Sequence, residues 1–241
     1  MLYNIYIIII IYFLFGALGF YFINRKKTPD IARQNRIKYI SYFIIINILF
    51  FSIVINPVIF RCLAVLIILA GTYEIISLFV KSGFKNPGVF SMAIIVLGIN
   101  AIGFYVFSTL EKELILFTFL ILSIFDSFSQ ISGQLFGHRK IIPSISPNKT
   151  FGGLIGGLLA ALISSFLLSE LYPQSLSGIF LTTTGIITFA FIGDISTSYY
   201  KRKYQVKDFN NLIPGHGGFL DRFDSLIVAG TWMAFTHFLM H

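Results

Sequence analysis

The residues whose types are best suited to catalysis or ligand binding lie in a polar interval at 193–224, between two long apolar segments. Asp194, Ser198 and Arg202 are spaced at i, i+4 and i+8, so a helix would place them on one face. Lys201 would lie close to that face. Acidic side chains beside membrane-length apolar segments are costly, which favours a functional role. The spacing therefore predicts a helix face on which acids and cations act together.

A second polar face lies where the last apolar segment begins. Asp221, Asp224 and Ser225 would stand there, although the helix dipole alone favours one acid at such a position. Acids from two helices can also bind Mg²⁺, which takes carboxylates and completes its shell with water and substrate phosphates. The cations around these acids would balance phosphate charge, and they are Lys201, Arg202, Lys207 and Arg222.

Between the two faces, Gly215, Gly217 and Gly218 flank the lone His216. Glycines let a backbone approach a ligand without a Cβ in the way. His216 could donate to a phosphate, act as a general acid or be structural, and its place in this loop favours contact with a ligand. A zinc site is not favoured, because the histidines and the single Cys62 lack ligand spacing.

A further polar cluster occupies 126–153. Four of its residues share one face at helical spacing: Asp126, Gln130, Gly133 and Gly137. An acid, an amide and two glycines on one stripe predict close helix contact around a buried polar site. The alternative is a purely structural hydrogen bond from Asp126 to a neighbouring helix.

The same cluster ends in Ser-Pro-Asn-Lys-Thr at 146–150. Ser146 or Thr150 could cap a helix that begins near residue 151. The free N–H groups of that helix, the hydroxyls and Lys149 would then form a phosphate site. The alternative is simple capping, with a lysine that only sets topology. The P-loop motif is absent, so this segment is not a nucleotide cradle of that type.

The composition is that of a polytopic helical membrane protein. Of the 241 residues, 56% are hydrophobic and 12% are charged, and the mean hydropathy is +0.84. These values exclude an ordinary soluble domain and a disordered chain. The protein has a net charge of +8. We do not expect it to bind nucleic acid, because the sequence has no soluble domain with a basic and aromatic patch.

We predict an all-α fold, a transmembrane bundle of about eight spans, because a bilayer core needs about 20 apolar residues per helix. The spans are 2–23, 39–56, 60–80, 88–108, 114–133, 152–171, 178–198 and 222–240. The second and third would form a tight hairpin or one broken helix around Asn56. The first has no cleavage site and is expected to be retained. We expect one continuous membrane domain, with N-terminal transmembrane helices over 1–110 and the helices and loops that carry the chemistry over 111–241.

The cations predict the orientation of these spans. With alternating spans, sixteen Lys and Arg residues fall on one side of the membrane, whereas only Arg61 and Lys112 fall on the other. The positive-inside rule makes the first side cytoplasmic. A cytoplasmic nucleotide could then reach the polar clusters, and we expect an integral protein of a bacterial inner membrane. Glu74 lies toward the cytoplasmic end of its span, where a functional or pairing role is expected.

Taken together, these motifs resemble the signature of the phosphatidate cytidylyltransferases, also called CDP-diacylglycerol synthases. The resemblance is carried by 198–202, 207–208, 213–218 and 221–224, with an upstream block at 126–151 that holds an Asp, a Phe-Gly pair and an SPxKT motif. Tyr200, Asn210 and Gly152 depart from the usual residues of the family, but no carboxylate, lysine or histidine of the core signature is lost. The resemblance implies the reaction of CTP with phosphatidate to give CDP-diacylglycerol and pyrophosphate.

The resemblance also implies roles for individual residues. Asp194 and Asp221 would bind Mg²⁺, with Asp224 as a third ligand or an orienting residue, and a second cation is a further expectation. The catalytic set would comprise Asp194, Asp221, Asp224, Lys201, Arg202 and His216. The substrate-binding set would comprise Ser146, Lys149, Thr150, Ser198, Lys207, Gly217, Gly218, Arg222 and Asp126. Expected partners are CTP, phosphatidate or a related lipid phosphate, membrane lipids and a second copy of the chain in a homodimer.

Two alternatives remain beside this interpretation. A CTP-dependent enzyme acting on another lipid, such as a polyprenol-type kinase or an archaeol-type cytidylyltransferase, would share the membrane site. A non-enzymatic lipid transporter would need polar residues through the bilayer and a repeat in its two halves. Here the polar groups lie mostly at one face and no repeat is detectable, so the transporter is less favoured.

Overall fold

The computed structural model describes residues 2–25, 27–213 and 217–240. Its helices are α1 (Leu2–Asn24), α2 (Pro29–Ile55), α3 (Pro57–Lys81), α4 (Pro87–Phe107), α5 (Lys112–Phe136), α6 (Phe151–Leu167), α7 (Leu176–Lys203) and α8 (Leu220–Met240). A 3₁₀ helix, η1 (Ser169–Leu171), follows α6. The strands β1 (Lys140–Ile142) and β2 (Ser146–Thr150) form an antiparallel hairpin. The all-α polytopic prediction is confirmed, with this short hairpin as the unexpected addition.

Each predicted span corresponds to one helix, but the helices differ in how well they suit a bilayer. Within the described residues, six helices are long and apolar enough to cross a membrane, namely α1 to α5 and α7. The apolar α6 has only 17 residues, because the chain continues as η1 after Leu168. The first five residues of α8 include Asp221, Arg222 and Asp224, so its apolar part is shorter than the helix.

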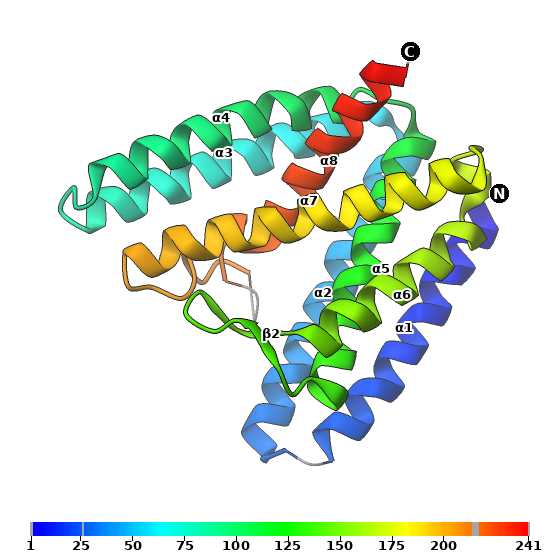
Figure 1. Ribbon diagram of the computed structural model, residues 1–241, viewed down its shortest axis with the longest axis horizontal. Coiled ribbons are helices and arrows are strands. Elements are labelled where there is room, and N and C mark those ends of the chain that lie inside the picture. Colours follow the sequence, from blue (N-terminus) through cyan, green and yellow to red (C-terminus); the bar gives the residue numbers. More distant parts are fainter. Residues whose placement is uncertain (1, 26, 214–216, 241) are drawn as a thin grey trace.

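The second helix begins earlier than the apolar pattern indicates. Pro29 occupies its first turn and Thr28 precedes it in an extended conformation, a combination suited to a helix start. The basic stretch before residue 39 is therefore mostly helical. Asn56 then ends α2 in an extended conformation, and its side chain accepts a hydrogen bond from the Val58 N–H at 2.9 Å. Figure 1 shows α3 beside α4 and diverging from α2, so this junction is a break and not a tight hairpin.

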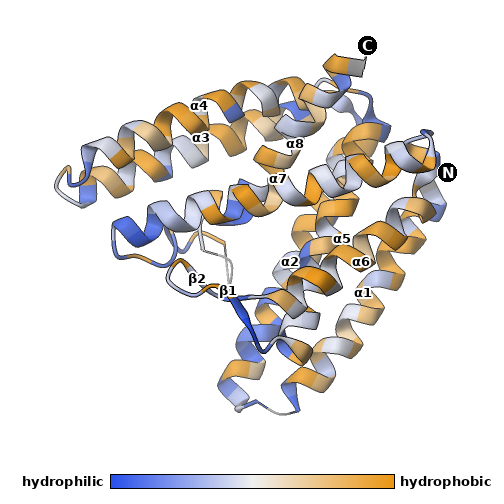
Figure 2. Ribbon diagram, viewed as in Figure 1, coloured by the Kyte–Doolittle hydropathy of each residue, from blue (hydrophilic) through white to orange (hydrophobic). Residues whose placement is uncertain are grey.

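The helices form two groups that diverge from one another, with α7 running between them (Figure 1). One group contains α3, α4 and α8, and the other contains α1, α2, α5 and α6. Figure 2 shows hydrophilic residues on one side of the molecule, at the α1–α2 connection, the hairpin, the α3–α4 turn and the end of α7. The outer helix faces are apolar, with exposed side chains such as Leu66, Ile99 and Ile163. This distribution is that of a bundle surrounded by lipid.

The central helix α5 carries the polar residues Asp126 and Gln130 in its second half. It is the most enclosed candidate span, with 61% of its apolar window buried. Glycines let it approach α6 closely, since a Cβ at Gly153 would lie 2.7 Å from the Ser129 carbonyl oxygen and 3.2 Å from the Cα of Gly133. The predicted close contact along the glycine face is confirmed.

Candidate active site

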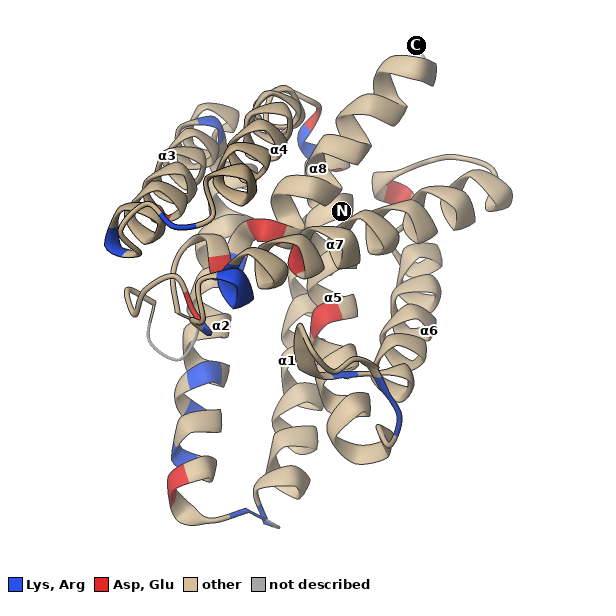
Figure 3. Cartoon of the chain, turned by 60° about the vertical axis from the view of Figure 1, so that its left-hand side comes forward, with Lys and Arg blue, Asp and Glu red and all other residues tan. Residues whose placement is uncertain are grey.

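A cavity of about 960 Å³ lies between α1, α2, α5 and the polar loops. This volume is at the upper end of the range of about 300–1,000 Å³ that is usual for small-molecule sites. Its polar part is lined by Asp126, Asn148, Asp194, Lys207, Asp208, Asp221 and Arg222. Its apolar part is lined by Ile8, Ile9, Phe13, Ile46, Leu120 and Ile124. Figure 3 shows acidic and basic positions of α7, α8 and their connection grouped together, with basic positions along α2.

The acidic face of α7 forms as the spacing predicts. Asp194 Oδ1 accepts a hydrogen bond from the Ser198 hydroxyl at 3.3 Å. Its Oδ2 pairs with Lys149 Nζ of β2 at 2.5 Å, and the Asp194 side chain remains 38% exposed. Lys149 also lies over the Phe191 ring, 4.2 Å from the ring centroid. The structure thus joins the SPxKT block and the α7 face at the edge of the cavity.

Arg202, which we predicted to bind phosphate, is bound to the backbone in the structure. Its Nε donates to the Ile145 carbonyl at 3.0 Å and its Nη1 donates to the Val206 carbonyl at 2.8 Å. These contacts fasten the hairpin turn and the α7–α8 loop to the end of α7. Arg202 therefore supports the shape of the site, and its contact with a phosphate stays a prediction.

Asp221 and Lys201 form the most buried ion pair among the described residues. Lys201 Nζ lies 2.6 Å from Asp221 Oδ1, and the two side chains are 8% and 4% exposed. Asp221 Oδ2 accepts from the backbone N–H groups of Phe209 at 2.7 Å and Gly218 at 2.8 Å. The carboxylate therefore fastens two points of the α7–α8 loop, one inside it and one next to α8, to the start of α8. Gly217 has a φ of +82° and lies so close to Asp221 that a side chain there would collide.

Glu74, whose partner the sequence does not indicate, caps the last helix. It is 2% exposed, and its carboxylate accepts from the backbone N–H groups of Phe219 at 2.8 Å and Leu220 at 2.7 Å. The Asn210 amide donates to the same carboxylate. A carboxylate at a helix N-terminus is stabilised by the unpaired N–H groups and the helix dipole. Glu74 thereby fixes the start of the helix that carries Asp221.

We expect Glu74→Gln to lower the free energy of unfolding by about 1–3 kcal/mol, because the amide leaves one buried N–H donor facing another donor. Thermal unfolding of the purified chain in detergent measures this change. Glu170→Gln is the matched control, since Glu170 is an exposed acid in η1. Equal unfolding midpoints for Glu74→Gln and the control would contradict the capping role.

The third predicted metal ligand, Asp224, is oriented differently from the other two. It is 5% exposed and accepts from the Thr197 hydroxyl and from the Ser225 N–H at 2.6 Å. It borders a separate cavity of about 120 Å³, although it remains within electrostatic reach of Asp194. In the described part of the chain, no group of three or more acidic, His or Cys side chains is placed to hold a metal. This position suits the orienting role better than direct ligation.

Asp194 and Asp221 nevertheless fit a hard cation. A carboxylate offers about four lone-pair positions. Among the residues that the structure describes, Asp194 contacts one donor on each oxygen, and Asp221 Oδ1 contacts Lys201 alone. Both residues line the large cavity and keep acceptor capacity there. Oxygen ligands of this type are what Mg²⁺ requires.

The start of α6 is capped by Thr150, and a phosphate contact there stays a prediction. Thr150 is buried and its hydroxyl accepts from the Gly153 N–H at 3.1 Å, which confirms it as the cap. Ser146 lies in β2, away from this cap. A Cβ at Gly152 would lie 3.0 Å from the Phe136 carbonyl oxygen, so the end of α5 covers the start of α6. This packing favours the capping interpretation for Thr150.

The remaining predicted residues are distributed around the cavity. Lys207, Gly217 and Arg222 line it, whereas Gly218 packs against Glu74. Asp126 Oδ2 lies 3.9 Å from Arg222 Nη1 of α8, an ion-pair distance that is too long for the structural hydrogen bond considered as the alternative role of Asp126. Gly215 and His216 lie outside the described residues.

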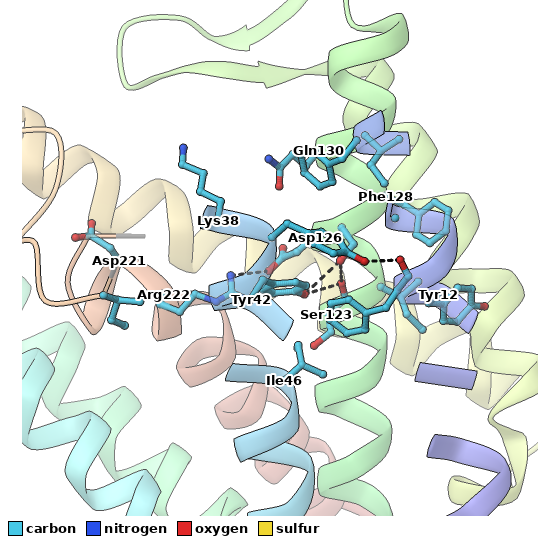
Figure 4. A pocket seen from close by; sticks show the side chains of 18 of the residues that line it. Tyr12, Lys38, Tyr42, Ile46, Ser123, Asp126, Phe128, Gln130, Asp221 and Arg222 are labelled. Atoms are coloured by element: carbon cyan, nitrogen blue, oxygen red, sulfur yellow. Dashed lines mark hydrogen bonds and ion pairs between the residues drawn. The ribbon is translucent and has the colours of Figure 1, made fainter. Parts of the chain in front are cut away.

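The N-terminal helices contribute residues that the motif analysis does not identify. Lys38 and Tyr42 of α2 and Tyr12 of α1 line the cavity, and Figure 4 shows them around Asp126 and Arg222. A tyrosine in an apolar helix is common, so its type and spacing give no signal of a site. Lys38 has the sequence context of a topogenic lysine.

The chain resembles known proteins over the segment that carries the site. The family model described as "Cytidylyltransferase family" matches residues 90–240, which extend from α4 to α8. The chain is 36% identical over 133 residues to the phosphatidate cytidylyltransferase of Haemophilus influenzae, a match covering 53% of this chain and 46% of that protein. It is 35% identical over 152 residues to the protein of the same name from Rickettsia bellii, covering 60% and 66% of the two chains.

A longer match extends to the N-terminal helices. The phosphatidate cytidylyltransferase of Rickettsia prowazekii is 30% identical over 217 residues, which cover 86% of this chain and 94% of that protein. The chain otherwise spans about half to two thirds of the length of the first two relatives. The match from α4 to α8 includes the α7 face, the loop and the α8 start described above. The chain belongs to the Cytidylyltransferase family.

Proposed function

We propose that this protein is a phosphatidate cytidylyltransferase, which converts CTP and phosphatidate to CDP-diacylglycerol and pyrophosphate. The observation that carries the proposal is the single cavity of about 960 Å³, in which a charged part continues into an apolar part between α1, α2 and α5. A nucleotide triphosphate suits the charged part and acyl chains suit the apolar part. The names of the relatives from Haemophilus and Rickettsia support this reaction.

The reaction needs two anions to meet. The phosphate oxygen of the lipid attacks the α-phosphorus of CTP, the bond from that phosphorus to the β-phosphate oxygen breaks, and pyrophosphate leaves. The lipid phosphate is already an anion, so a general base contributes little. The main barrier is repulsion between the anions, which fixed cations lower by stabilising the developing charge. Lys207, which lines the cavity, and Lys149, which pairs with the cavity residue Asp194, would supply these cations.

Mg²⁺ is the cofactor we propose, held by Asp194 and Asp221, with Asp224 behind them as an orienting residue. Bound there, the cation would neutralise phosphate charge and polarise the α-phosphorus. Asp194 also holds Lys149 in place at 2.5 Å. Asp221 keeps the loop after α7 closed around the polar part of the cavity.

The cellular setting forms part of the proposal. The protein would lie in a bacterial inner membrane with the cavity open to the cytoplasm, because sixteen of its eighteen Lys and Arg residues are assigned to the side of the polar loops. CTP would then be available at the site. A homodimer stays a prediction, which the mass of the protein–detergent particle would test.

Transfer of label from CTP separates this proposal from its nearest rival. We expect phosphorus label at the α-position of CTP to enter the lipid product, and label at the γ-position to leave with pyrophosphate. A polyprenol-type lipid kinase would give the reverse pattern. Lipid labelled only from the γ-position would therefore contradict cytidylyl transfer.

A further inference from the structure

Arg222 lies where the charged part of the cavity meets its apolar part. Its guanidinium carbon is 4.4 Å from the centroid of the Tyr42 ring, and its Nη1 is 3.9 Å from Asp126 Oδ2. Figure 4 shows Arg222 between Asp221 on one side and Tyr42, Ser123 and Ile46 on the other. The guanidinium therefore packs against the Tyr42 ring and forms an ion pair with Asp126, and Arg222 also borders the cavity.

The guanidinium has unused donors. Arg222 is 17% exposed at its side chain, and its buried Nε has no hydrogen-bond partner among the described residues. The 3.9 Å separation from Asp126 is too long for a hydrogen bond. A buried donor without a partner costs free energy. A planar guanidinium can donate two parallel hydrogen bonds to two oxygens of one phosphate. The arrangement is therefore suited to an anionic phosphate that enters the cavity.

The surroundings of Arg222 indicate which phosphate this is. Ile46 lies one helical turn after Tyr42 on α2, and Leu120 and Ile124 lie on α5 within one turn of Ser123, whose carbonyl accepts a hydrogen bond from Tyr42; all three line the cavity. A phosphate bound by Arg222 could place hydrocarbon beside these residues, whereas a cytidine there would leave its polar groups without partners. Asp194, the proposed Mg²⁺ ligand, and Lys149, which pairs with it, lie instead on α7 and on the hairpin, respectively.

We propose that Arg222 binds the phosphate of the lipid substrate, that Tyr42 positions its guanidinium, and that the apolar lining between α1, α2 and α5 takes the beginning of the acyl chains. This inference rests on the proposed function. Tyr42 is itself fixed, since its hydroxyl donates to the Ser123 carbonyl at 2.9 Å. Tyr42 and Ile46 lie before residue 90, where the family match begins. Selection of the lipid would thus depend on helices that precede the matched segment.

Kinetics of the purified 241-residue chain in mixed micelles test the positioning role. We expect Tyr42→Leu to raise the apparent KM for phosphatidate about 3- to 30-fold, the range that a cation–π contact supports. The KM for CTP and the kcat should stay within about twofold, because the nucleotide contacts are untouched. Tyr42→Phe keeps the ring and should raise the lipid KM by less than about threefold. Tyr105→Leu is the matched control, since Tyr105 is an exposed tyrosine of α4 away from the cavity.

Arg222→Lys provides the second variant, because lysine keeps the charge but loses the planar fork and the stacking. It should raise the lipid KM and leave the KM for CTP within about twofold. An increase in the KM for CTP with an unchanged lipid KM would assign Arg222 to the nucleotide and overturn the proposal. Unchanged lipid KM values in both Tyr42→Leu and Arg222→Lys would also overturn it.

Binding without CTP separates this inference from the reaction itself. Isothermal titration with dihexanoyl phosphatidate, compared with dihexanoylglycerol that lacks the phosphate, needs no turnover. Loss of phosphate-dependent binding in Arg222→Lys supports the inference even if wild-type protein transfers no cytidylyl group, a result that would defeat the proposed function alone. Wild-type turnover together with equal binding by wild type and Arg222→Lys would defeat the inference alone.

Discussion

Asp194→Asn is expected to reduce kcat by at least about 100-fold, because it removes a charged group of the cavity that we propose to hold Mg²⁺ at the reacting phosphates. Asp194 is 38% exposed at its side chain and pairs with Lys149 at 2.5 Å. Asparagine has nearly the same shape but only one acceptor oxygen and no charge. It would weaken both the proposed Mg²⁺ contact and the anchoring of Lys149. Initial rates of pyrophosphate release at saturating CTP and lipid measure the effect.

A second measurement and a control variant distinguish loss of a metal ligand from a general loss of activity in Asp194→Asn. The Mg²⁺ concentration that gives half-maximal rate should rise about tenfold or more, as expected when a metal ligand is weakened. Asp30→Asn is the control, since Asp30 is an exposed acid in the first turn of α2. Asp194→Asn with a kcat within twofold of the control and an unchanged Mg²⁺ requirement would remove Asp194 from the active site.

Asp221→Asn is expected to lower the free energy of unfolding by about 3–5 kcal/mol, because it leaves Lys201 charged and buried without its partner. The pair is 2.6 Å long and both side chains are at most 8% exposed. The same substitution weakens the closure of the loop through Phe209 and Gly218. Activity should fall with stability. Thermal unfolding in detergent, followed beside the initial rate, measures both effects.

A double variant separates the structural part of the Asp221 effect from the chemical part. Lys201→Met with Asp221→Asn removes the stranded charge, and it should recover most of the lost stability because a neutral pair needs no ionic partner. The rate should remain low, since the carboxylate proposed to bind Mg²⁺ is still missing. Recovery of the rate together with stability would mean that Asp221 acts only as a loop anchor.

The sequence predicts the helices well because membrane spans have a strong hydropathy signal. Eight apolar segments were expected, and each corresponds to a helix of the structure. The boundary of α2 was wrong by ten residues, since the charges before residue 39 suggested a loop although Pro29 favours a helix start. The hairpin at 140–150 was missed because a strand of three residues has too short a pattern to detect.

For the candidate site, the spacing of residues along one helix predicted their common face, whereas contacts between segments far apart in the sequence could not be predicted. The α7 face with Asp194 and Ser198 formed as predicted. The pairing of Glu74 with the start of α8 joins residues 145 and 146 positions apart, which no local pattern encodes. Asp221 and Asp224 are three residues apart on α8, yet the first faces the loop and the second borders another cavity. Tyr42 gave no signal, because its role depends on the guanidinium that packs against it.

We propose that one cavity brings a nucleotide and a lipid phosphate together for cytidylyl transfer. Pyrophosphate release by the purified chain, in micelles with CTP, phosphatidate and Mg²⁺, tests it most directly. We predict release that requires all three components and that is matched mole for mole by CDP-diacylglycerol. Release that proceeds equally well without phosphatidate, or no release from a folded chain, would contradict the account.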